Sequence, residues 1–110
     1  MEVIDINSAL ERLDGDRELC RELLLDFRSD YSGVDRTLRE KLRDGTTDDA
    51  RELLHNLRGA AGNLGMGRLE AAAETLSRQI RAGAVEASAL DTFSEELNLV
   101  LSELERFEQP

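Results

Sequence analysis

The chain has 110 residues, enough for one domain around a single core, and we expect that domain to span residues 1–110. With 24 acidic and 14 basic residues, its formal net charge of −10 argues against nucleic acid and anionic membrane surfaces as partners and favours a monomer. The single cysteine, Cys20, excludes an intramolecular disulfide, and one cysteine with one histidine cannot build a metal cluster, so we expect no cofactor. The lack of a long apolar run and of a signal peptide argues against membrane insertion and favours the cytoplasm.

Apolar residues recur at intervals of three and four along most of the chain, which predicts helices throughout. Asp5 is the expected N-cap of a short first helix. A long second helix follows, with Leu19 and Cys20 expected at or near the core and a bend or division expected at Ser32-Gly33. The five predicted helices cover about 6–13, 17–43, 48–64, 68–82 and, starting at either Val85 or Ala87, a last segment to Phe107. Because the loops are short, we expect an all-α fold, an up-down antiparallel four-helix bundle with a short additional N-terminal helix.

The third predicted helix carries the only histidine and has one apolar and one polar side. At roughly 100° per residue, the apolar side collects Ala50, Leu53, Leu54, Leu57, Ala60, Ala61 and Leu64. The opposite side collects Asp48, Arg51, Glu52, His55, Arg58, Gly59 and Gly62. His55 lies near the middle of this polar side, so we expect it to face water.

Two glycines follow His55 on the polar side. A glycine inside a helix costs about 0.5–1 kcal/mol relative to alanine, so Gly59 and Gly62 require a reason. The close approach of another macromolecule to the imidazole is one such reason. Arg58, one turn after the histidine, supplies a positive charge suited to a phosphoryl group. A surface histidine without a function is the alternative that the helical pattern leaves open.

Residues 55–65 read His-Asn-Leu-Arg-Gly-Ala-Ala-Gly-Asn-Leu-Gly, and this segment resembles the signature of histidine-containing phosphotransfer (HPt) domains. The likeness extends from about Ile4 to about Leu104. It implies a phosphorelay carrier that accepts a phosphoryl group on Nε2 of His55 from a receiver-domain aspartate and passes it to another receiver aspartate. The implied partners are receiver domains of response regulators or hybrid sensor kinases. Many members carry Gln or Glu near the histidine on the next helix, whereas that place falls here on Ser77, whose side chain is shorter.

We therefore assign His55 as the phosphoacceptor. Phosphoryl or partner binding is assigned to Arg51, Glu52, Arg58, Gly59, Gly62 and Ser77. The chain has no P-loop and no serine or cysteine nucleophile in a recognisable arrangement with His55, so we expect a carrier without autokinase or hydrolase activity. The alternatives are a non-catalytic helical adaptor, the phosphoacceptor module of a chemotaxis-type histidine kinase, and a metal site of His55 with Glu52 and Asp48.

Overall fold

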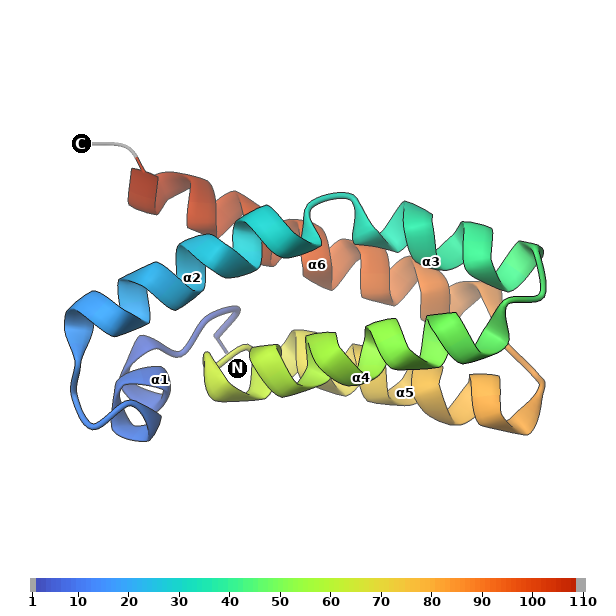
Figure 1. The fold of residues 1–110 in the computed structure, drawn as a ribbon, viewed down its shortest axis with the longest axis horizontal. Helices are drawn as coiled ribbons and strands as arrows, with labels where there is room; N and C mark the ends of the chain where they lie inside the picture. The colour runs from blue at the N-terminus through green and yellow to red at the C-terminus, as the bar shows by residue number, and fades with distance from the viewer. Residues whose placement is uncertain (1, 109–110) are drawn as a thin grey trace.

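The computed structural model describes residues 2–108, and this part of the chain is helical, without a strand (Figure 1). The six helices are α1 (Ile6–Arg12), α2 (Arg17–Tyr31), α3 (Val34–Arg43), α4 (Thr47–Asn63), α5 (Gly67–Ala82) and α6 (Ala87–Glu108). They form an elongated molecule with extents of 41 × 24 × 23 Å. The prediction of an all-α chain is confirmed. None of the helices within residues 2–108 has the length and apolar character needed to cross a membrane.

The long second helix of the prediction is divided in two. α2 ends at Tyr31 and α3 begins at Val34, with Ser32 extended and Gly33 in the left-handed region at φ +75°. A side chain disfavours this backbone conformation, which is why a glycine allows the chain to leave one helix and enter the next. α2 and α3 follow one another along α6 (Figure 1).

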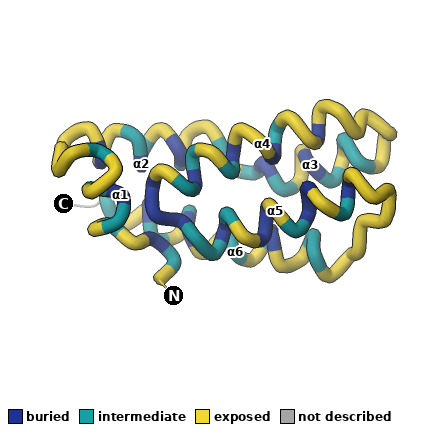
Figure 2. Tube along the Cα trace, turned by 90° about the horizontal axis from the view of Figure 1, so that it is seen from below, coloured by how far each residue is buried: buried dark blue, intermediate teal, exposed yellow. Residues whose placement is uncertain are grey.

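The packing of α4 against α5 is the most extensive helix contact in the fold. The chain reverses between these helices at residues 64–66, so α4 and α5 lie side by side (Figure 1). α5 also packs on α6, and α3 contacts both α4 and α6. Figure 2 shows the buried positions of these helices along their inner sides. The side chains without exposed surface include Leu54, Leu57, Leu69, Leu76, Phe93 and Leu97. This core fixes the inner side of α4 and leaves its outer side in solvent.

One expected core position is wrong, at the start of α2. Leu19 is 38 % exposed, whereas the next residue, Cys20, is only 3 % exposed. Cys20 shares the inward side of α2 with Leu24 and Phe27, because intervals of four and three return to the same side of a helix. The inward side of α2 therefore begins one residue later than Leu19.

The first helix closes the end of the molecule where α4 turns into α5. Asp5 caps α1 as expected, since its Oδ1 accepts a hydrogen bond from the Ser8 N–H at 3.1 Å. The Asp5 N–H in turn donates to the Gly65 carbonyl at 2.8 Å. Gly65 has φ +71°, and a Cβ there would collide with the Asp5 carbonyl oxygen, so both backbone conformation and space require glycine. This junction fixes the C-terminal end of the histidine helix.

Candidate functional site

His55 lies in the middle of α4, on the side that faces solvent. Leu54 and Leu57, on the inward side, are fully buried and anchor the helix beneath the histidine. Within residues 2–108, His55 makes no hydrogen bond and no ion pair. The protein therefore presents an imidazole whose nitrogens it does not engage. A neutral imidazole carries one nitrogen lone pair, which is available here to an incoming electrophile.

An open depression of about 320 Å³ lies around His55. It is lined by Asp48, Arg51, Glu52, His55, Arg58, Ser77 and Arg81. The first five residues come from α4, where intervals of three and four place them on one side, and the last two come from α5. Four of the predicted binding residues therefore lie together with His55: Arg51, Glu52 and Arg58 share its helix, and the contact between α4 and α5 adds Ser77.

Three arginines line this depression: Arg51, Arg58 and Arg81. The Arg58 guanidinium also reaches Glu74 of α5, with 3.5 Å between Nη2 and Oε2. Arg81 is exposed on α5, one turn after Ser77. Arg81 was not among the residues predicted for the site, although its four-residue spacing from Ser77 could have identified it. Guanidinium groups around one imidazole suit a dianionic phosphoryl group, because each can donate charge-assisted hydrogen bonds to its oxygens.

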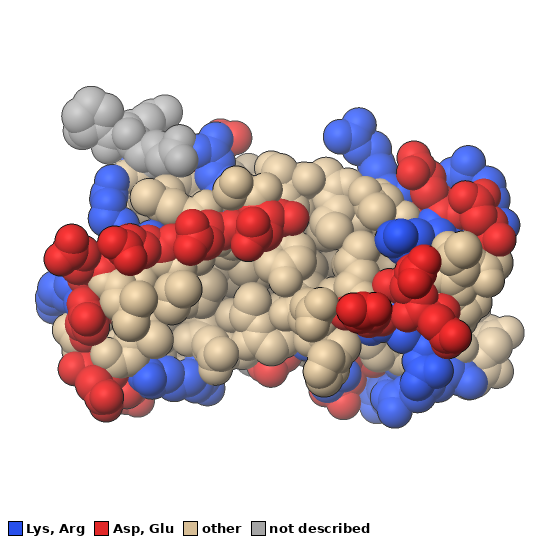
Figure 3. Space-filling view, in the orientation of Figure 1, with Lys and Arg blue, Asp and Glu red and all other residues tan. Residues whose placement is uncertain are grey.

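A row of exposed acidic side chains lies on another helix, α2. Exposed acidic residues follow α2 at intervals of four: Glu18, Glu22, Asp26 and Asp30. Figure 3 shows a row of acidic side chains along this helix. The depression around His55, by comparison, holds three arginines and two acidic residues, Asp48 and Glu52, and Arg51 Nη1 lies 4.0 Å from Asp48 Oδ1.

Gly59 is exposed on α4, and a Cβ built there would have no neighbouring atom within 4 Å. Among residues 2–108, no other helix reaches within 4 Å of this Cβ position. The core therefore does not require a glycine at residue 59. The missing side chain leaves open space beside His55 for a macromolecular partner.

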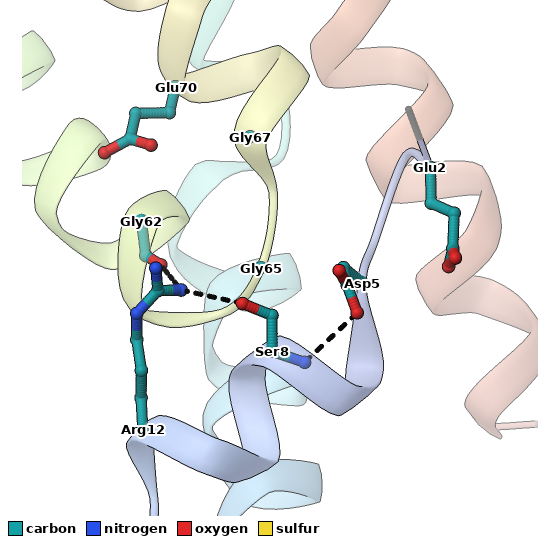
Figure 4. A pocket seen from close by; sticks show the side chains of 8 residues that line it. All are labelled: Glu2, Asp5, Ser8, Arg12, Gly62, Gly65, Gly67 and Glu70. Carbon is teal, nitrogen blue, oxygen red and sulfur yellow. Dashed lines mark hydrogen bonds between the residues drawn. The ribbon is translucent and has the colours of Figure 1, made fainter.

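Gly62 has different surroundings, although helical spacing puts it on the same side of α4 as His55. Its carbonyl accepts a hydrogen bond from the Arg12 guanidinium of α1 (Figure 4). A Cβ at Gly62 would lie 2.6 Å from Oε2 of Glu70, the far end of a flexible side chain. Gly62 lines a separate pocket of about 710 Å³, whose lining includes neither histidine nor cysteine. The structure thus separates Gly62 from the depression around His55.

Ser77 is buried, with 8 % of its surface exposed, and it lines the depression from α5. Within the described part of the chain, no hydrogen bond joins Ser77 to His55. The short hydroxymethyl side chain does not orient the imidazole as a longer Gln or Glu would.

The metal alternative has no geometric support among residues 2–108, where no three His, Cys, Asp or Glu side chains are grouped so that they could hold an ion. Asp48, Glu52 and His55 line the same depression without forming such a group.

The chain matches the family model described as the Hpt domain over residues 22–109. The match begins within α2 and includes α4, α5 and the whole depression around His55. No match was found among curated protein sequences.

Proposed function

The chain belongs to the Hpt domain family, and from this membership we propose that His55 carries a phosphoryl group between the aspartates of two receiver domains. Hpt domains act in phosphorelays and interact with receiver domains. The observation that carries the assignment to His55 is its exposure on the outer side of α4, beside the open surface at Gly59.

The proposed step is an in-line displacement at phosphorus. The lone pair on His55 Nε2, the nitrogen favoured by the family resemblance, attacks the phosphorus of the receiver's aspartyl phosphate. A nitrogen–phosphorus bond forms, the bond from phosphorus to the aspartate oxygen breaks, and the aspartate leaves as a carboxylate. The proton on Nδ1 stays on the ring or passes to solvent, which has free access to the exposed side chain. The second transfer reverses these bond changes toward another aspartate.

The residues around His55 would stabilise and admit the phosphoryl group. Arg51, Arg58 and Arg81 line the depression and provide positive charge for the phosphoryl oxygens. Gly59 leaves room for the receiver surface. The receiver supplies the activated phosphoryl group and its metal ion, so the carrier needs no nucleotide site. We accordingly propose a carrier without autokinase or hydrolase activity.

We further propose that the helices form an up-down antiparallel four-helix bundle in which α2 and α3 together count as one member. In support, the contacts run in a closed ring from α3 to α4, to α5, to α6 and back to α3, with α2 also on α6. A monomer in the reducing cytoplasm is in keeping with the free, buried Cys20 and the net charge of −10.

The test of this function is phosphotransfer from receiver domains charged with acetyl phosphate. We expect the protein to gain phosphate that is labile in acid and stable in base, and His55→Gln to remain folded and gain none. A His55→Gln protein that still accepts phosphate would refute the assignment. Labelling only by a kinase with ATP, and never by a receiver, would identify a chemotaxis-type phosphoacceptor module. Receiver binding without any labelling would identify an adaptor.

A further inference from the structure

The Arg58 side chain lies between the depression around His55 and the carboxylate of Glu74. On one side it lines the depression that contains His55, and on the other its Nη2 lies 3.5 Å from Oε2 of Glu74. Glu74 belongs to α5 and does not line the depression. The Arg58 and Glu74 side chains are 30 % and 49 % exposed, so the ion pair lies at the surface of the contact between α4 and α5.

The contact with Glu74 leaves most of the hydrogen-bonding capacity of Arg58 unused. A guanidinium has five N–H donors, and 3.5 Å is beyond the usual length of a charge-assisted hydrogen bond. The Nε atom of Arg58 is buried and has no hydrogen-bond partner. By contrast, Arg68 holds Glu96 at 2.9 Å with a hydrogen bond. Arg58 is therefore attracted toward Glu74 by charge but remains loosely held.

We propose that Glu74 limits how tightly phosphohistidine is held, because it competes with the phosphoryl group for Arg58. The proposal rests on the proposed function of His55. In the unphosphorylated protein Arg58 pairs with Glu74. When His55 is phosphorylated, the phosphoryl oxygens draw the guanidinium toward the depression, and the loss of the Glu74 contact offsets part of the gain. The phosphoryl group is then released more readily to the next aspartate. Glu74 is thus a positioning residue that acts through Arg58.

The test is the equilibrium distribution of phosphoryl groups between a receiver and His55, measured from labelled protein at fixed concentrations. Glu74→Gln removes the charge and keeps the shape of the side chain. We expect this substitution to shift the distribution toward phosphohistidine by about two- to fivefold, the range for a surface ion pair. Glu70→Gln, one turn earlier on α5 and without an ion pair to Arg58, is the matched control and should leave the distribution unchanged.

A double-mutant cycle identifies Arg58 as the intermediary. Arg58→Ala alone should shift the distribution away from phosphohistidine, and in that background Glu74→Gln should have no effect. An equal effect of Glu74→Gln with and without Arg58 would mean direct repulsion between Glu74 and the phosphoryl group, and would overturn the proposal. A shift toward the receiver, or no shift, in the Glu74→Gln protein would also overturn it. If the wild-type protein forms no phosphohistidine, the proposed function itself fails, which is a distinct result.

Discussion

Gly59 allows stability and function to be separated at one position. We expect Gly59→Ala to raise the free energy of unfolding by about 0.5–1 kcal/mol, because alanine restricts the unfolded chain and favours the helix. The added Cβ meets no neighbouring atom within 4 Å, so no steric penalty opposes this gain. For a domain of this size the gain corresponds to a rise of about 2–5 °C in the thermal midpoint. If Gly59 were instead required for packing between helices, the midpoint would fall.

The Gly59→Gln substitution tests whether a side chain at residue 59 blocks phosphotransfer. Glutamine is a good helix former, and its side chain would extend from the open surface beside His55, so the fold should be retained. In the complex, that side chain would stand between the receiver and the imidazole. Transfer requires the reacting atoms to lie about 3–3.5 Å apart, and a displacement of about 1 Å can reduce the rate about a hundredfold. We therefore expect a loss of about a hundredfold in the initial rate of transfer from a phosphorylated receiver.

The assay combines thermal melts by circular dichroism with initial transfer rates for wild-type, Gly59→Ala and Gly59→Gln proteins. Glu95→Gln, an exposed substitution on α6, controls for the introduction of a glutamine and should transfer at the wild-type rate. A lower midpoint for Gly59→Ala, or a folded Gly59→Gln protein that transfers normally, would contradict these predictions.

Three further outcomes are expected. Arg81→Ala should slow transfer to His55 by about two- to fivefold at low salt, and by less at high ionic strength. Arg78→Ala, which lies outside the depression, should leave the transfer rate unchanged, and equal effects of the two substitutions would show that Arg81 is not part of the site. Gly65→Ala should lower the stability in urea unfolding by about 1–3 kcal/mol, because the new Cβ would collide with the Asp5 backbone at a positive φ; an unchanged midpoint would contradict this. Burial raises the pKa of the Cys20 thiol, so at a given pH less of it is thiolate than in an exposed thiol. At about pH 8, iodoacetamide should therefore alkylate Cys20 of the native protein more slowly than it alkylates the thiol of free glutathione, and denaturant should abolish this difference.

Helical periodicity correctly predicted which residues of a single helix, α4, face the core and which face solvent. The alternation of apolar and polar residues along α4 correctly placed Leu54 and Leu57 inside and His55 outside. It also placed Gly62 with His55, but the surroundings of Gly62 depend on α1, whose Arg12 reaches the Gly62 carbonyl. Periodicity within α4 contains no information about where α1 packs.

The arginines beside His55 also show that periodicity within one helix does not reveal contributions from another helix. Arg58 was identified because it follows the histidine by one turn of its own helix. Arg81 comes from α5, and its place in the depression depends on how α5 is positioned against α4. Similarly, Leu19 and Cys20 are adjacent, and only the packed structure distinguishes which of the two faces the core. Because both residues are apolar, moving the inward side of the helix by one residue leaves the apolar pattern of the sequence almost unchanged.

The row of acidic residues on α2 affects which helices of the domain unfold locally first. Like charges four residues apart on a helix repel one another by about 0.2–0.5 kcal/mol per pair, and Glu18, Glu22, Asp26 and Asp30 form such a series. The helical state of α2 is therefore supported by packing of its buried residues, Cys20, Leu24 and Phe27, and α2 contacts α6 and α1. The histidine helix has a more extensive contact with α5. Backbone amides of α2 are accordingly expected to exchange with solvent by local opening, while α4 and α5 keep the phosphoryl site assembled.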